Sequence, residues 1–280
     1  MAERLRVLTM NVLAPEYADW PRRRRVIADE LRALRPDVVA LQEVTPGGPA
    51  ELLGEGWHIT GHPHRGPDGV GAALALRRPP RAVHRRDLFV TDRARAQPWC
   101  GVAAAEVPGP GEMGPLLVVH HKPSWPYDHE RERELQAVSC ARFVEEILAG
   151  RDADAAPPHV LLLGDFDAAP DAASIRFLTG RQSLDGRSVC YRDAWPAARP
   201  GEPGHTFSPR NELVRAGDMA GDPGRRIDYV MVRCGPHGPS LDVAACDRVL
   251  VDPVAGVQAS DHYGVVADLV LPAREPGRWA

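Results

Sequence analysis

Residues 161–170 of the chain read LLLGDFDAAP. Three leucines run directly into a glycine, and two aspartates, Asp165 and Asp167, then stand on either side of a phenylalanine. An apolar run of this kind, bounded by a turn-forming segment, predicts a buried strand over 159–167. Because the end of a strand holds its side chains rigidly, we expect this segment to present two carboxylates at the edge of a sheet.

Several other apolar segments also lead into polar residues. Strands are expected over 4–13, 37–44, 68–79, 99–108, 114–122, 225–233 and 263–272, and helices over 20–36, 128–150 and 170–180. Pro21 suits the first turn of its helix, Gly150 is a candidate C-cap, and residues 99–122 predict a hairpin. No linker divides these elements, so polar residues at strand ends can converge on one edge of a sheet.

The overall composition is that of a slightly acidic globular protein. The 280 residues carry a formal net charge of −4, which gives no global basic field to attract nucleic acid or an anionic membrane. Five scattered cysteines form no CxxC pair. The N-terminus enters a strand too early for a signal peptide, and no apolar run reaches the ~20 residues of a membrane span. We therefore expect a soluble cytoplasmic protein in a reducing compartment.

One set of polar side chains stands at or just beyond the strands. It comprises Asn11, Glu43, His121, Asp165, Asp167, Asp228, Asp261 and His262. Taken singly, each has a structural alternative: a carboxylate can form a turn or a helix cap, His121 can be a core histidine, and Asp228 can pair with a neighbouring arginine. Taken together, they supply oxygen ligands for a hard cation such as Mg²⁺ and donors for phosphate. The set favours metal-assisted phosphoryl chemistry.

The chain resembles the endonuclease/exonuclease/phosphatase superfamily in six successive motifs: TMNVL, PDVVALQEV, HHK followed by RELQ, LLLGDFDAAPD, RRIDYVMVR and SDHYGVVADL. That superfamily includes apurinic endonucleases, pancreatic-type deoxyribonucleases and neutral sphingomyelinases. The resemblance covers residues 5–270 and implies an α/β fold, a four-layered α/β sandwich of two packed mixed β-sheets flanked by helices. It also implies a single domain over 1–273 and a C-terminal tail over 274–280.

The resemblance assigns the metal site to three residues. Glu43 would be the principal metal carboxylate, with Asn11 beside it contacting phosphate or a metal-bound water. Asp261 would complete the metal edge. The cofactor implied is Mg²⁺, with Mn²⁺ as the alternative.

The catalytic roles are carried over in the same way. Asp165 would orient or deprotonate the attacking water. His262 would contact the scissile phosphate and be oriented by Asp228, whose carboxylate would favour the charged imidazole. His121 would donate to a phosphate oxygen, and His120 would be a neighbour without a catalytic role.

Asp167 departs from the family pattern, in which asparagine is usual at this position. An amide donates and accepts hydrogen bonds, whereas an ionised carboxylate only accepts. Three consequences are open: Asp167 is protonated because of a nearby like charge, it recruits a second metal, or it weakens or reshapes the site. We favour retained catalysis because the other motif residues are present.

Substrate contacts are expected from loops and from one aromatic residue. Phe207 either stacks on a base or lines the pocket wall, or it packs in the core. The loops 61–66 and 122–131 follow strands and contain candidate contact residues, namely His64, Arg65, Trp125, Tyr127 and His129. The four arginines at 22–25 are interpreted as a solvated helix face rather than a phosphate site.

These observations predict a divalent-metal-dependent phosphoesterase that hydrolyses a phosphodiester or phosphomonoester, with a phosphorylated small molecule as substrate. The first alternative is an endo- or exonuclease acting on DNA or RNA, although no run of basic and aromatic residues for gripping a duplex is evident. The second alternative is a degenerate scaffold that binds a phosphorylated ligand without turnover. The sequence leaves the oligomeric state open.

Overall fold

The computed structural model describes residues 3–274 and 276–277, and these form two mixed β-sheets. The six-stranded sheet has the order β12 (Asp242–Val249), β13 (Gly264–Val270), β1 (Arg4–Asn11), β2 (Val38–Val44), β4 (Gly71–Leu76) and β3 (His58–Gly61). The second sheet has the order β11 (Gly238–Pro239), β10 (Asp228–Gly235), β8 (His159–Asp165), β7 (Pro115–Lys122), β6 (Gly101–Pro108) and β5 (Ala82–Asp87), and β9 (Tyr191–Asp193) pairs with β10. The predicted tail over 274–280 lies partly outside the described residues.

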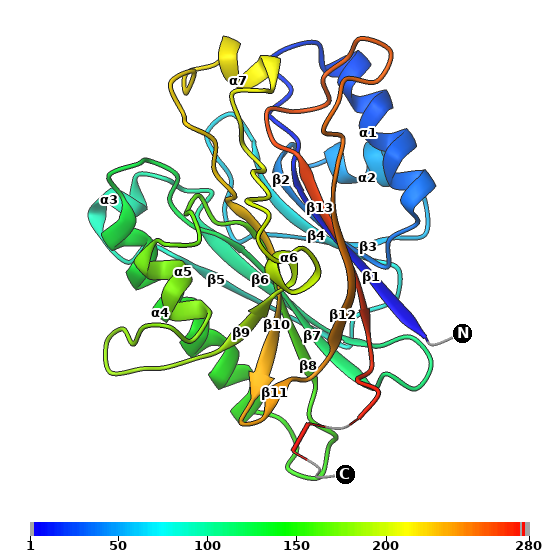
Figure 1. Cartoon of the computed structure of the whole chain (residues 1–280), viewed down its shortest axis with the longest axis vertical. Coiled ribbons are helices and arrows are strands. Elements are labelled where there is room, and N and C mark those ends of the chain that lie inside the picture. The colour runs from blue at the N-terminus through cyan, green and yellow to red at the C-terminus, as the bar shows by residue number, and fades with distance from the viewer. Residues whose placement is uncertain (1–2, 275, 278–280) are drawn as a thin grey trace.

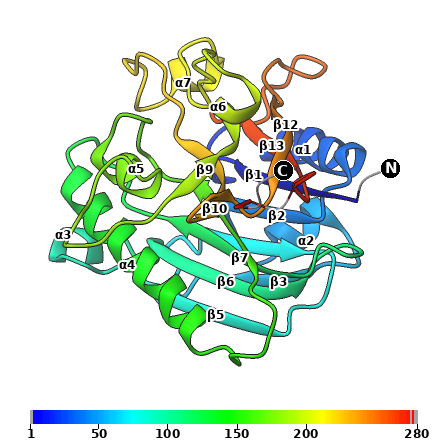
Figure 2. The same cartoon turned by 60° about the horizontal axis from the view of Figure 1, so that its bottom comes forward.

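Helices cover the outer face of each sheet (Figures 1 and 2). The six-stranded sheet carries α1 (Trp20–Leu34) and α2 (Gly48–Leu53), and the other sheet carries α4 (Glu130–Ala149) and α5 (Ala173–Leu178). The short helices α3 (Asp92–Arg95), α6 (Ala194–Ala198) and α7 (Glu212–Ala216) lie in the connections. Among the residues that the structure describes, no helix is long and apolar enough to cross a membrane.

Three apolar layers explain why the elements stack in this way. The inner faces of both sheets meet in one cluster that includes Val7, Val118 and Leu163. The outer face of the six-stranded sheet packs against Ile27 of α1, and that of the other sheet packs against α4 and α5. The central strands of each sheet are therefore buried on both faces, which is why they read as nearly continuous apolar runs. The predicted four-layered α/β sandwich is confirmed.

The strand directions bring the motif residues to one edge of the sandwich. β1 runs parallel to β2, and β7 runs parallel to β8, so their carboxyl ends lie together within each sheet. β13 and β10 run antiparallel to β1 and β8, so their beginnings lie at that same edge. Segments more than 200 residues apart in sequence meet there, as the hydroxyl of Ser260 donates to the carbonyl of Asn11 at 2.8 Å.

Gly164 allows β7 and β8 to approach closely just before the acidic pair. Its φ is +151°, and a Cβ atom at this position would lie 2.1 Å from the carbonyl oxygen of His121. Any side chain here would push the two strands apart. The glycine in LLLGDFD is therefore required by strand packing, and it sets the position of Asp165 against β7.

Local expectations for the helices hold with one refinement. Pro21 lies in the first turn of α1, and the side chain of Asp19 caps that helix by accepting from the backbone N–H of Arg22 at 3.2 Å. Gly150 does cap α4, but its φ is −80°, a conformation open to any residue. Its glycine is therefore not needed for a left-handed cap.

Candidate active site

Asn11 links the two sheets at the site. Its side-chain N–H groups donate to Oε1 of Glu43 at 2.9 Å and to Oδ2 of Asp165 at 3.1 Å. Its own Oδ1 accepts from the backbone N–H of Leu13 at 3.0 Å, which fixes the orientation of the amide. An amide is suited to this place because it can donate to two carboxylates that would otherwise repel each other.

Glu43 is held in an unusual backbone conformation. Its φ is +60°, and the pairing of β2 with β4 shifts register between Leu41 and Val44. A non-glycine residue in this region costs on the order of 1–3 kcal/mol and persists only where the surroundings hold it. Here the backbone N–H of Ala14 donates to Oε2 at 3.0 Å and Asn11 donates to Oε1. The carboxylate is thereby turned toward the pocket instead of along the strand.

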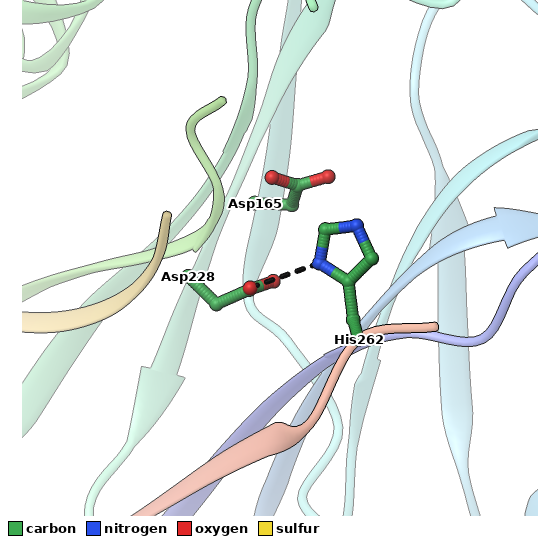
Figure 3. A group of neighbouring side chains, drawn as sticks. All are labelled: Asp165, Asp228 and His262. Atoms are coloured by element: carbon green, nitrogen blue, oxygen red, sulfur yellow. Dashed lines mark hydrogen bonds and ion pairs between the residues drawn. The ribbon is translucent and has the colours of Figure 1, made fainter. Parts of the chain in front are cut away.

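His262, Asp228 and Asp165 form a buried group (Figure 3). Nδ1 of His262 lies 3.0 Å from Oδ2 of Asp228, and one ligand atom from each of the three residues lies within 4.8 Å of the others. Burial alone would lower the pKa of His262, but the carboxylates of Asp228 and Asp165 raise it well above the usual value. The imidazole is therefore charged at neutral pH. The pairing implied by the resemblance is present in the structure.

Lys122 is a member of the site that our reasoning from sequence missed. Its ammonium lies 2.8 Å from Oδ2 of Asp165 and also contacts Oδ2 of Asp167. Burial would lower the pKa of Lys122, yet the two carboxylates raise it well above that of a free lysine. Conversely, burial would raise the pKa of Asp165, and Lys122 and His262 lower it to about 2. Asp165 is therefore ionised at neutral pH.

Asp167 faces this ammonium. Its φ is +53°, which aspartate tolerates better than most residues, and its backbone N–H donates to Oδ1 of Asp165 at 3.2 Å. Burial and the charge of Asp165 raise the pKa of Asp167 in spite of Lys122. To the three consequences considered for this aspartate, the structure adds a fourth arrangement, a direct ion pair with a buried lysine.

His121 lies on the other face of β7. Alternation along the strand places Leu116, Val118 and Lys122 on the inner side, while His121 contacts the ring of Phe166 at 5.0 Å on the helix side. Burial, and then the charge of Lys122, lower the pKa of His121 to about 3, so it is neutral. The phosphate contact predicted for His121 therefore finds no support in this geometry. His120 is a neighbour, held 2.7 Å from Nε2 of Gln42.

The expectation for the arginine run is wrong at one position. Arg23 is buried, 1% exposed, rather than solvated. Its guanidinium donates to the backbone carbonyls of Val12 at 2.7 Å, Tyr17 at 2.7 Å and Ala259 at 3.2 Å, with further contacts to Leu13 and Ala14. It thereby ties the loop after β1 to the loop before β13, the two loops that flank Asn11 and Asp261.

Two carboxylates have the character of a cation site. Glu43 and Asp261 both line the pocket, and among the described residues neither forms an ion pair with a lysine or arginine within 4.0 Å. Burial and the charge of Glu43 raise the pKa of Asp261, while His262 acts in the opposite direction. Two neighbouring oxygen donors without a direct ion pair to lysine or arginine suit a hard divalent ion. The residues present therefore fit the Mg²⁺ that the resemblance implies.

Asp165, Asp228 and His262 lie close enough together to hold a metal ion, but their chemistry argues against one. Burial lowers the pKa of His262, but the carboxylates of Asp228 and Asp165 raise it and favour the charged imidazole, whereas a histidine ligand must be neutral. Asp165 already accepts from Lys122, Asn11 and the Asp167 backbone. We therefore place the candidate cation at Glu43 and Asp261.

A cavity of about 780 Å³ opens over these groups. Its lining includes Asn11, Glu43, Lys122, Asp167, Phe207, Asp261 and His262, and also Glu16, Tyr17, Asp68, Trp99, Trp125, Leu213, Asp218 and Met219. Phe207 both packs in the core and lines the cavity. It packs with Val214 and Ile227, and the centroid of its ring lies 5.0 Å from that of His262.

The remaining predicted substrate residues make structural contacts outside this lining. Arg65 donates to the carbonyls of Val44 at 2.7 Å and Gly69 at 3.1 Å. The ring of His64 stacks on that of Phe89, and Tyr127 donates to Asp222 at 2.7 Å. His129 lies at the start of α4, 3.1 Å from Nε2 of Gln97. Among the loop candidates, only Trp125 lines the cavity.

The comparisons with known proteins agree with this architecture. A model described as the Endonuclease/Exonuclease/phosphatase family matches residues 8–262, so the chain belongs to this family. No curated protein matches the chain.

Solved structures with the same fold share little sequence with the chain. D. rerio TDP2 complexed with a single-strand DNA product has a TM-score of 0.72 at 17% identity, covering 95% of this chain and 99% of that one. The human Nocturnin catalytic domain with bound sulfate has 0.69 at 20%, covering 96% and 94%. ANGEL2, a 2′,3′-cyclic phosphatase, in complex with adenosine-2′,3′-vanadate has 0.73 at 14%, covering 96% of each chain. Such identities establish the fold alone.

Proposed function

We propose that this chain is a divalent-metal-dependent phosphoesterase that hydrolyses a phosphodiester or phosphomonoester of a small molecule. One observation carries the proposal: among the described residues, a single cavity presents two carboxylates without a lysine or arginine ion pair, Glu43 and Asp261, beside the side chains of His262 and Lys122. This arrangement offers a place for a cation and donors for a phosphate group at the same time.

The chain's own residues divide the work as follows. Glu43 and Asp261 would hold Mg²⁺, or Mn²⁺, with Asn11 orienting Glu43. The bound ion would supply charge stabilisation to the phosphate oxygens. His262, held by Asp228, donates to the scissile phosphate. Asp165 has a low pKa and is a weak base, so we favour orientation of the attacking water over its deprotonation.

The charge of the cavity supports a small substrate. Glu16, Asp68 and Asp218 add three carboxylates to its lining, and Lys122 and His262 are the basic side chains among the described lining residues. A polynucleotide needs basic side chains for the phosphates that flank the reacting one. The lining instead suits an uncharged or cationic organic group beside one phosphate, and the volume lies within the roughly 300–1,000 Å³ of small-molecule sites.

The test is a panel of phosphomonoesters, phosphodiesters and oligonucleotides with Mg²⁺ and with Mn²⁺. We expect metal-dependent release of p-nitrophenol from a model ester, and loss of that release in Glu43→Ala and His262→Ala. Arg25→Ala, on the exposed side of α1, is the matched control and should retain activity. Full activity in His262→Ala would defeat the assignment.

A nuclease is the second candidate function, favoured by the complex of D. rerio TDP2 with single-strand DNA product. It predicts cleavage of DNA or RNA that falls steeply with salt concentration, because phosphate contacts release counterions. Cleavage of oligonucleotides that exceeds turnover of every small ester would replace our proposal by this one.

A scaffold without turnover is the third reading, and Asp167 motivates it. On that reading, ligands raise the melting temperature without being cleaved, and Asp167→Asn gains activity. On ours, Asp167→Asn lowers activity because Lys122 loses one of its two carboxylate partners.

A further inference from the structure

We infer that Lys122 contacts the scissile phosphate of the substrate and that Asp167 positions it for that contact. The inference rests on the proposed phosphoesterase function and adds a catalytic residue to it. It explains two features of the site together: the aspartate at position 167, where the family pattern has asparagine, and the buried ammonium of Lys122.

The composition of the chain first singles out this residue. Lysine and arginine together number 34, and Lys122 is the sole lysine. All the other residues in this count, exposed or buried, are arginines. A chain that uses arginine throughout and retains one lysine in the lining of its cavity indicates a local requirement for an ammonium group.

The geometry explains that requirement. An ammonium is a compact charge with three donors, whereas a guanidinium is a wide planar fork. The ammonium of Lys122 contacts one oxygen of Asp165 and one of Asp167, which accounts for two donors. Lys122 also lines the cavity together with His262, so its third N–H is available to a phosphate oxygen there.

Asp167 contributes position and charge. Without it, the lysine stem could swing toward Asp165 alone, and with it the ammonium lies between two fixed carboxylates. The left-handed backbone of Asp167 and its N–H contact to Asp165 hold the second carboxylate in place. The pair thereby supplies a phosphate donor at a position where, in the family pattern, one amide would stand.

A simpler reading is that Lys122 only balances two neighbouring carboxylates. The two readings differ in a double-mutant cycle with Lys122→Met and Asp167→Gly. Glycine accepts the positive φ of residue 167 and brings no new donor. If the lysine only balances charge, the loss of Asp167 removes part of what it balances, so Lys122→Met costs less activity in the Asp167→Gly background than in the unsubstituted chain. If it contacts phosphate, the double variant stays below Asp167→Gly by roughly 10²–10³-fold in kcat, the loss typical of one such donor.

Direct observation is available without any substitution. Protein labelled with ¹⁵N-lysine carries a single side-chain ammonium signal, so its assignment is automatic. We expect titration with inorganic phosphate or orthovanadate, in the presence of Mg²⁺, to shift that signal, and sodium chloride at equal ionic strength to leave it in place. A signal unmoved by either oxyanion overturns the inference.

The two proposals can fail separately. Hydrolysis of esters with an unmoved lysine signal would remove the Lys122 contact and leave the phosphoesterase. A shifted signal without hydrolysis of any ester would leave Lys122 as a phosphate ligand and remove the proposed activity. Thermal unfolding of Lys122→Met, compared with the unsubstituted chain, separates lost contact from lost fold, and the labelled protein remains decisive if that variant does not fold.

Discussion

Asp165 and Asp228 occupy directly opposed positions of the antiparallel strands β8 and β10, and both are buried. Each has its own cation: Lys122 lies 2.8 Å from Asp165, and Nδ1 of His262 lies 3.0 Å from Asp228. The cations come from different sheets, one from the end of β7 and one from the loop before β13. Two bare carboxylates at this depth would repel and take up protons. The charge balance of the site therefore depends on how the two sheets pack against each other.

Asp228→Asn should leave the shape of the site intact and remove the charge that holds His262. We expect kcat to fall by about 10²–10⁴-fold, because a misoriented or neutral imidazole no longer stabilises charge at the phosphate. Steady-state kinetics on a p-nitrophenyl ester measures this. The matched control is Asp242→Asn, at the exposed start of β12, which should keep full activity. Unchanged kcat in Asp228→Asn would remove the orienting role.

Glu43→Gln and Asp261→Asn should each abolish stabilisation by metal. If the proposed site binds Mg²⁺, free ion at 100 times its dissociation constant adds about 2.7 kcal/mol to the unfolding free energy. Thermal melts with Mg²⁺ and with EDTA detect it, with Glu55→Gln in an exposed loop as the control. Metal stabilisation that persists in both variants would place the ion elsewhere.

Arg23→Met should destabilise the fold by more than about 3 kcal/mol, since several buried carbonyls lose their donor at once. Arg25→Met, two residues along the same helix and exposed, should change stability by less than about 0.5 kcal/mol. Urea unfolding of both variants measures the contrast. Equal effects would mean that the burial of Arg23 carries no energetic weight.

Gly164→Ala should cost at least about 1–3 kcal/mol, because its φ of +151° disfavours any side chain and the new methyl group would meet the His121 carbonyl. Gly221→Ala is the control, since that position has no positive φ and no atom within 4 Å of the added Cβ. A Gly164→Ala protein with the same melting temperature as the Gly221→Ala protein would contradict the close approach of β7 and β8.

The loss of folding stability at acid pH should depend in part on Asp268. Arg6 donates to its two oxygens at 2.7 and 2.8 Å, and this hydrogen bonding is the main cause that lowers the pKa of Asp268. A lowered pKa contributes stability above the unfolded value of about 3.9, and that contribution is lost as pH falls through the folded value. Asp268→Asn should therefore lose less than about 1 kcal/mol at neutral pH and show a flatter decline in acid. Urea unfolding at pH 7 and at pH 3 compares the unfolding free energy of Asp268→Asn with that of the unsubstituted chain.

Much of the fold was accessible from sequence because each motif couples an apolar run to a polar end. The strand before Asp165, the hairpin over 99–122 and the helix begun by Pro21 follow from local pattern and appear as expected. The order of the motifs was enough to indicate the sandwich. The strands β5 and β12 were not predicted, because partly exposed residues alternate in them without a strong apolar run.

The site itself divides differently. Its acidic members, Asn11 and His262 could be chosen from sequence, because they stand directly after or before strands whose ends share one edge. The choice between His121 and Lys122 could not be made in this way. Both faces of β7 are buried, so the strand lacks the alternation that would reveal which side faces the cavity. A lone lysine was the available signal, and it lay in composition rather than in pattern.

The amino-acid sequence by itself determined which elements form and which residues stand at their ends, because strand and helix periodicity and turn chemistry act over a few neighbouring residues. Tertiary structure decided which cation meets which carboxylate. Arg23 is chemically identical to the three arginines beside it, and only the convergence of the loops at 12–17 and 259 makes it a buried donor. Lys122 and Asp165 lie 43 residues apart and His262 and Asp228 lie 34 apart, and these charges become partners only in the folded chain, since electrostatic pairing at this depth is set by distance in space.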